Sequence, residues 1–122
     1  MTFTIVQTKT TPLAEFRDGY LSISGKSVPF NYPEIYDTIR DRLTLYMEKP
    51  EKHTTIDFRL SAINAASKRS IINTFCLFEE MKSKGCDVHV NWFYQSDDED
   101  IFELGEIFQS VFDLDIHLRQ QD

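Results

Sequence analysis

The sequence is poor in the features that would place a protein in a membrane or in an oxidising compartment. It has no run of about 18 apolar residues, so no membrane-spanning helix is expected, and its first residues do not resemble a signal peptide. Only two cysteines occur, and both are expected to be buried, inert thiols, Cys76 within a helix and Cys86 at the start of a strand. We therefore expect a cytoplasmic protein with reduced thiols and no membrane insertion.

A scarcity of glycine and a surplus of acid limit what the chain can bind. The four glycines, Gly19, Gly25, Gly85 and Gly105, are scattered along the chain and are expected in turns or helices. There is therefore no glycine-rich loop to hold a phosphate. The net charge of −7 opposes binding to nucleic acid, because that affinity depends on neutralising phosphates, and it opposes binding to anionic membranes. We expect no nucleic-acid partner.

The candidate catalytic and metal-ligating residues form no recognisable constellation. His53, His89 and His117 lie far apart along the chain, with no Asp or Glu at a metal-ligand spacing and no neighbouring nucleophile. The acidic run from Asp97 to Glu106 matches no calcium loop and is typical of a helix start with a solvated face. We therefore predict no metal, no cofactor and no enzymatic activity.

Hydrophobic periodicity predicts six strands and three helices. Alternating residues predict strands at 3–8, 13–17, 20–24, 54–60, 87–94 and 114–118. Gly25 is expected to end the third strand. Apolar residues at helical spacing predict helices whose buried faces extend over 35–47, 71–81 and 101–111. Asn31 and Ser96 are the predicted N-cap residues of the first and third helices.

The order β-β-β-α-β-α-β-α-β predicts a single α/β domain over residues 1–122, with a mixed β-sheet and about three α-helices. The first three strands lack intervening helices and are expected to be antiparallel, whereas the later strand-helix alternations predict parallel strands joined by crossover helices. This order is compatible with a STAS-like architecture, in which helices pack on a small central sheet.

A small polar turn joins a predicted strand to a predicted helix within LSAINAASKRSII, residues 60–72. A helix N-terminus offers unpaired backbone N–H groups and the positive end of the helix dipole, so a phosphate there is well accommodated. Between Asn64 and the basic pair Lys68 and Arg69, Ser67 carries the only hydroxyl. The residues alone leave two interpretations open: Ser67 is a phosphorylation site, or Asn64 or Ser67 is simply an N-cap.

Three stretches together resemble the SiaC-type regulatory phosphoproteins, small bacterial proteins with a STAS-like fold. The family's opening has a Thr-Pro pair, a short strand and a Gly-x-Ser-Tyr-Pro-Glu-Asn loop, and it resembles TKTTPLAEFRDGYLSISGKSVPFN, Thr8–Asn31. The family's Trp-x-Tyr segment, acidic helix start and Glu-x-Gly-Glu resemble VNWFYQSDDEDIFELGE, Val90–Glu106. The third stretch is the turn at Asn64, and the resemblance extends over nearly the whole chain.

The turn departs from the family pattern at the regulatory position. The family's turn is approximately Asn-Thr-Ser-Ser-x-Lys, and its threonine is the phosphorylation site. On that register Asn64 and Ser67 match, and Arg69 replaces the lysine. The threonine and the serine after it are replaced by Ala65 and Ala66. The resemblance therefore leaves two states open, one with Ser67 phosphorylated instead and one in which the protein is constitutively active.

The resemblance implies a non-enzymatic signalling adaptor that binds a diguanylate cyclase. In the family, the unphosphorylated form promotes cyclic di-GMP synthesis and so favours aggregation or biofilm, and a cognate serine/threonine kinase and phosphatase control it. The residues expected to bind the partner are Asn64, Ala65, Ala66, Ser67, Lys68, Arg69, Ser27 and Pro29.

Two other functions are compatible with the residues. One is an anti-sigma factor antagonist in a partner-switching module, by analogy of fold alone. The other is a small-molecule-binding α/β domain with a pocket near Trp92 and Tyr94, although aromatic residues that alternate with polar ones in a strand are typical of a core. A monomer and a dimer formed through a sheet edge or the first helix are both compatible with the sequence.

Overall fold

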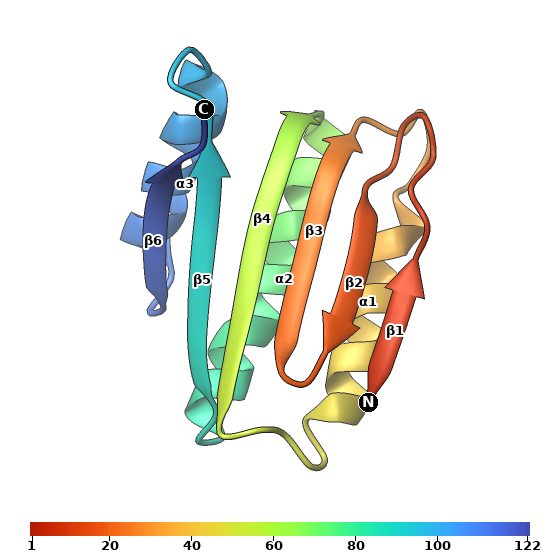
Figure 1. The fold of residues 1–122 in the computed structure, drawn as a ribbon, viewed down its shortest axis with the longest axis vertical. Coiled ribbons are helices and arrows are strands. Elements are labelled where there is room, and N and C mark those ends of the chain that lie inside the picture. Colours follow the sequence, from red (N-terminus) through yellow and green to blue (C-terminus); the bar gives the residue numbers. More distant parts are fainter.

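The fold is a six-stranded β-sheet with three helices packed against one of its faces. The computed structural model describes all residues from 1 to 122, and Figure 1 shows the helices behind the sheet. In chain order the elements are β1 (Thr2–Ile5), β2 (Leu13–Arg17), β3 (Tyr20–Ser27), α1 (Glu34–Tyr46), β4 (His53–Ile63), α2 (Ala65–Ser83), β5 (Asp87–Tyr94), α3 (Glu99–Val111) and β6 (Asp115–Gln120). The predicted α/β fold class and element order are confirmed. None of the three helices combines the length and apolarity that crossing a membrane requires.

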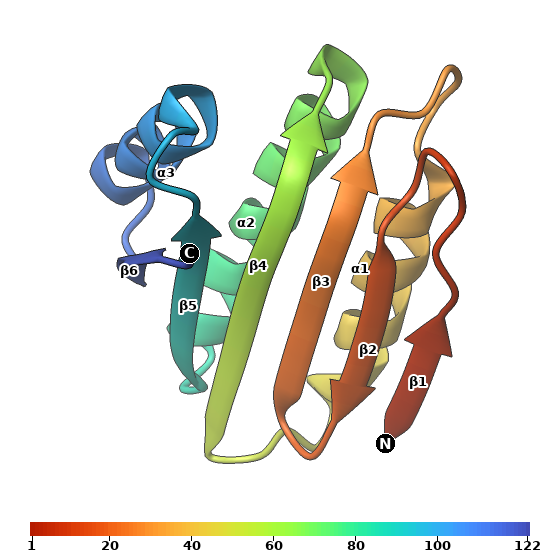
Figure 2. The same ribbon diagram turned by 45° about the horizontal axis from the view of Figure 1, so that its top comes forward.

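The strands follow one another across the sheet in the order in which they occur in the chain. β1, β2 and β3 pair antiparallel, whereas β3, β4, β5 and β6 pair parallel. Each parallel connection contains a helix, and such crossovers are right-handed, so a sheet that grows in one direction collects all its helices on one face. Figure 2 shows the result: α2 lies behind the centre of the sheet, between α1 and α3. The carboxyl ends of β3 and β4 meet at the edge where α2 begins.

The third strand is longer than its sequence predicts. β3 does not end at Gly25 but continues to Ser27 beside β4, after a shift in register between Gly25 and Lys26. Gly25 has a φ of +110°, which glycine adopts without steric cost, so the strand changes register at this residue and continues. β4 also continues past Leu60 to Ile63. These extra residues bring Ser27 next to the start of α2.

The helix starts differ from the predicted caps at two places. α1 begins directly after Pro33 with no side-chain cap, so Asn31 is not its N-cap residue. In α3 the side chain of Asp98, rather than that of Ser96, accepts the backbone N–H of Ile101, at 3.1 Å. Ser96 lies too early in the chain, in the turn that precedes the helix.

The apolar faces predicted for the helices pack against the sheet, in a core of 26 buried residues. Ile72, Ile107 and Val111 fall within the ranges predicted for the buried helix faces, but they lie at the borders of those faces and are exposed. Cys86 is buried as predicted, but Cys76 is exposed, so the prediction of a buried thiol is wrong there. Cys76 follows the core residue Phe75 on α2, and one residue along a helix turns the side chain away from the face that packs.

Aromatic rings fill the centre of the core. Phe75 of α2 lies with its ring centroid 4.6 Å from that of Phe108 on α3 and 5.4 Å from that of Phe58 on β4. Trp92 of β5 has no exposed surface, and its indole N–H donates to the carbonyl of Ile101 at 2.8 Å. Because Trp92 is fully covered, it cannot line a small-molecule pocket.

The face of the sheet that carries no helix is held together by polar side chains centred on Asp57. The Tyr20 hydroxyl donates to one oxygen of Asp57 at 2.5 Å, and the Asn91 amide donates to the other at 2.8 Å. Arg59 pairs with the same carboxylate at 3.3 Å, and its guanidinium lies 4.1 Å from the ring centroid of Phe93. These contacts satisfy a charge that is largely buried, and they link three neighbouring strands.

We expect Gly105→Ala to destabilise the protein by about 1–3 kcal/mol, because an added Cβ would lie 2.5 Å from side-chain atoms of both Trp92 and Leu118. An ordinary exposed helical glycine would respond in the opposite direction, gaining roughly 1 kcal/mol from the higher helix propensity of alanine. Urea unfolding measures the difference, with the exposed neighbour Glu106→Ala as the control. A stabilised Gly105→Ala protein would show that α3 does not rest on Trp92.

Candidate functional site

Asn64 holds the start of α2 at the end of β4. Its side-chain oxygen accepts the backbone N–H of Ser67 at 3.0 Å, so Asn64, and not Ser67, is the N-cap residue. Its side-chain NH₂ donates to the carbonyl of Pro29 at 2.8 Å, and its backbone N–H donates to the carbonyl of Ser27 at 3.1 Å. One side chain therefore ties the helix start to the loop that follows β3.

A chain of three buried hydroxyls lies directly beneath this turn. The Ser27 hydroxyl donates to Ser67 Oγ at 2.6 Å, and it lies 2.6 Å from the hydroxyl of Tyr36 on α1. Because Ser27 has one proton and gives it to Ser67, Tyr36 is the donor of the second bond. Burial raises the pKa of Tyr36 to about 12, so Tyr36 keeps its proton at neutral pH.

This arrangement divides the predicted contact residues into two groups. Ser27, Pro29 and Ser67 are buried, so they support the turn from inside and do not present a surface to a partner. Ser67 is 0% exposed, because the third helical position of α2 faces the core at this point. The exposed group is Ala65, Lys68 and Arg69, with Asn64 and Ala66 half-buried beside them.

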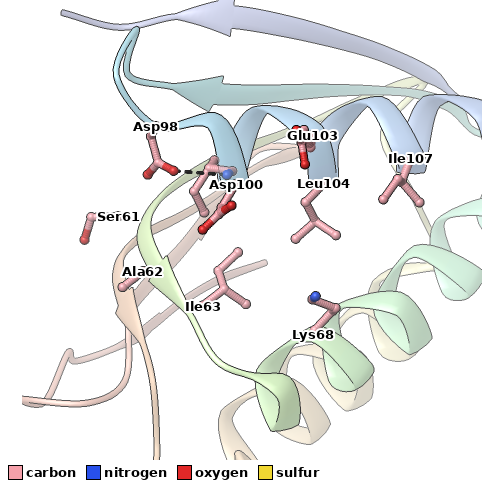
Figure 3. A pocket seen from close by; sticks show the side chains of 10 residues that line it. Ser61, Ala62, Ile63, Lys68, Asp98, Asp100, Glu103, Leu104 and Ile107 are labelled. Atoms are coloured by element: carbon pink, nitrogen blue, oxygen red, sulfur yellow. Dashed lines mark hydrogen bonds between the residues drawn. The ribbon is translucent and has the colours of Figure 1, made fainter.

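A hollow of about 580 Å³ opens on one side of the α2 start, between the end of β4 and α3. Figure 3 shows Lys68 pointing into it from α2, while Asp100 and Glu103 come from α3 on the opposite wall. The ten lining residues are Ser61, Ala62, Ile63, Lys68, Asp98, Asp100, Ile101, Glu103, Leu104 and Ile107. Lys68 makes no salt bridge with these acids, since the ion pairs of the protein involve other residues.

A second hollow, of about 450 Å³, lies on the other side of the α2 start. It is lined by Phe30, Asn31, Tyr32, Ala66, Arg69, Ser70 and Asn73. Phe30 is 97% exposed and Tyr32 is 59% exposed, so two aromatic rings stand at the surface next to Arg69. A large exposed ring beside a cation is typical of a protein-binding surface, where aromatic residues and arginine carry much of the affinity.

The tyrosine and the acids of this site are missed by sequence reasoning. The acids of α3 look like a solvated helix face, and only the fold places Asp100 and Glu103 across from Lys68. Tyr32 follows the loop that contains Pro29, and nothing in its spacing along the chain indicates that it lies beside Arg69. The exposure of Phe30 could have been predicted, because it lies in a loop between proline and asparagine, outside any predicted strand or helix that packs in the core.

The three histidines, which are separated along the chain, lie in one row on the open face of the sheet. His53 Nδ1 lies 2.7 Å from Asp87, His89 Nδ1 lies 2.6 Å from Asp115, and His117 Nε2 lies 2.9 Å from the same Asp115. The hydrogen bond to Asp115 raises the pKa of His89, with burial opposing it. The hydrogen bonds from His53 and His89 lower the pKa of Asp87. The prediction considered only the spacing of acids and histidines along the chain, whereas strand pairing places Asp87 and Asp115 beside the histidines in space.

We expect Ser27→Ala to destabilise the protein by about 1–3 kcal/mol, because it leaves the hydroxyls of Tyr36 and Ser67 buried without a partner. Urea unfolding measures the loss. Ser24→Ala, a half-buried serine on the same strand with no side-chain hydrogen bond, is the matched control and should change stability by less than about 0.5 kcal/mol. Equal stability of the two variants would contradict the role given to the hydroxyl chain.

Solved structures with the same fold come from Pseudomonas aeruginosa. The crystal structure of apo-SiaC superposes with a TM-score of 0.86 at 25% sequence identity, over 98% of each chain. The crystal structure of the diguanylate cyclase SiaD in complex with its activator SiaC contains a chain that matches with a TM-score of 0.86 at 24% identity, over 98% of this chain and 99% of that chain. The sheet order and helix placement described above are therefore those of SiaC, as the STAS-like prediction requires.

The same relationship is visible in the sequence. An uncharacterized protein of Pseudomonas aeruginosa (strain UCBPP-PA14) is 28% identical over 104 residues, which is 84% of this chain and 82% of that protein. The family model described as SiaC family regulatory phosphoprotein matches residues 5–121. Because the match extends over nearly the whole sequence, this chain belongs to the SiaC family of regulatory phosphoproteins.

Proposed function

We propose that this protein is a non-enzymatic adaptor that binds a diguanylate cyclase and promotes its synthesis of cyclic di-GMP. The observation that carries the proposal is membership of the SiaC family, together with a fold shared with the activator in the SiaD complex. The protein needs no catalytic residues for this role, because an activator works by binding one state of its partner more tightly than another.

The docking surface in this proposal surrounds the start of α2. We call Ala65, Ala66, Lys68, Arg69 and Phe30 the α2-start surface. It has what a protein interface needs at its centre: an exposed ring, two cations without salt bridges, and a rigid helix turn held from below by buried hydrogen bonds. The hollows on either side of the turn would accept side chains of the partner.

We further propose that this protein stays in the binding-competent state, because its turn at Asn64 has no accessible phosphorylation site. The position that carries the threonine in the family pattern is the exposed Ala65, which has no hydroxyl. The nearest hydroxyl, on Ser67, is fully buried and accepts a hydrogen bond from Ser27. A kinase would have to open the first turn of α2 to reach it. Burial therefore favours the constitutively active alternative over phosphorylation of Ser67.

The partner and the modification state are tested by one experiment. The untreated protein is captured from its native cytosol with an affinity tag, and mass spectrometry identifies both the co-purifying proteins and any phosphate on residues 61–70. We expect a diguanylate cyclase and no phosphate on Ser67, because its hydroxyl is inaccessible. An anti-sigma factor in place of the cyclase would overturn the proposed function. A cyclase together with phosphorylated Ser67 would overturn only the constitutive state.

We expect Ala65→Glu to weaken binding to the captured cyclase by at least about 10-fold, or 1.4 kcal/mol, because it places a negative charge at the centre of the α2-start surface. The same change should stabilise the free protein by about 0.3–1 kcal/mol, since an acid at the first helical position complements the helix dipole. Weaker binding by a more stable protein separates loss of the interface from loss of the fold.

Lys49→Glu is the control for this measurement. Lys49 is exposed and follows the end of α1 by three residues, and the change alters the net charge in the same direction. The end of α1 and the start of α2 lie at opposite ends of the sheet (Figure 1). Binding is measured by calorimetry against the purified cyclase, and cyclic di-GMP production is followed in parallel. Undiminished affinity of the Ala65→Glu protein would exclude the start of α2 from the interface.

A further inference from the structure

The row of histidines and acids on the open face of the sheet contains a set of metal-ligand atoms. One donor atom from each of His53, Asp87 and His89 lies within 4.8 Å of the other two. The set comes from two strands: His53 pairs with Asp87 across β4 and β5, and Asp87 and His89 are two apart on β5, so all three side chains share one face. None of these residues belongs to the α2-start surface.

Two histidine nitrogens approach the carboxylate of Asp87, one at each oxygen. Nδ1 of His53 lies 2.7 Å from one carboxylate oxygen of Asp87, and Nε2 of His89 lies 3.2 Å from the other. Tetrahedral zinc with bonds of about 2.0–2.2 Å holds its ligand atoms about 3.4 Å apart. These two distances involve different oxygens of Asp87, and one donor atom from each of the three residues lies within 4.8 Å of the other two, so small side-chain rotations would bring them to the zinc separation. The side chains of His53 and Asp87 are 63% and 49% exposed, so both can rotate without disturbing the core.

Asp115 prepares His89 for this role. Its carboxylate accepts Nδ1–H of His89 at 2.6 Å, so Nε2 is the ring nitrogen that faces Asp87, at 3.2 Å, and the one that would bind a metal in place of its proton. A carboxylate behind a ligating histidine is the usual arrangement in zinc proteins, where it orients the ring and raises its basicity. His117 holds Asp115 in turn, with Nε2 at 2.9 Å from the other oxygen.

We propose that His53, Asp87 and His89 bind one Zn²⁺ ion, with Asp115 as the positioning residue for His89. Two imidazoles and one carboxylate suit zinc and related borderline cations, whereas Mg²⁺ and Ca²⁺ prefer all-oxygen sites. Three protein ligands leave a fourth position open to water. The ion would join the first residues of β4 and β5, at the opposite end of the sheet from the start of α2 (Figure 1).

Calorimetric titration with ZnCl₂ tests the site, using the full chain without a histidine tag. The Cys76→Ser protein is the parent, because the exposed thiol of Cys76 would bind zinc by itself. We expect one ion per chain in the parent, and affinity lowered at least about 10-fold in His53→Gln and in His89→Gln. Asp115→Asn should lose about 10-fold through its effect on His89. Glu15→Gln, which removes an exposed carboxylate of β2 outside this row, is the control and should bind like the parent.

A second measurement guards against variants that fail to fold. In the ¹H–¹⁵N spectrum of the parent, ZnCl₂ should shift the signals of residues 53, 87 and 89, and MgCl₂ at the same concentration should not. Absence of binding to the parent at millimolar ZnCl₂ would overturn the proposal. Equal affinity of the parent and His53→Gln, or shifts confined to other residues, would do the same.

Discussion

The hydrogen bonds that converge on Ser27 hold together the edge of the molecule where β3, β4, α1 and α2 meet. Its hydroxyl bridges Tyr36 and Ser67, and its carbonyl accepts the backbone N–H of Asn64. The three hydroxyl-bearing residues are fully buried, so each hydroxyl would cost free energy if its partner were removed. The exposed first turn of α2 is rigid because its underside is fixed in this way. A partner that docks there would lose little conformational entropy in ordering it.

Much of the fold follows from local patterns in the sequence. Period-two alternation locates the strands, and apolar residues at helical spacing locate the helix faces, because both report burial directly. The first and last residues of the strands and helices are predicted less accurately. Gly25 interrupts the pattern of β3, yet hydrogen bonding to β4 continues beyond it, and a local pattern contains no information about a neighbouring strand. The N-cap of α3 is misplaced by two residues for the related reason that several acids and hydroxyls compete for the role.

The candidate site is predictable only in part. The turn from Asn64 to Arg69 is recognisable, since it joins a strand to a helix and carries an N-cap residue beside two cations. The inward orientation of Ser67 depends on how α2 is rotated about its own axis, and that rotation is set by packing against the sheet. The row of histidines depends on the registers of β4, β5 and β6, so it exists only after strands far apart in sequence have paired.

The covered hydroxyl of Ser67 and the missing hydroxyl at Ala65 also change what can control the proposed complex. A switch that is phosphorylated responds within the lifetime of the protein, at a constant amount of it. In the proposed constitutive state, the variable that remains at this turn is the concentration of the protein, and occupancy of the partner then follows mass action. Under that proposal, synthesis and degradation set how much partner is bound, and the response is as slow as the turnover of the protein.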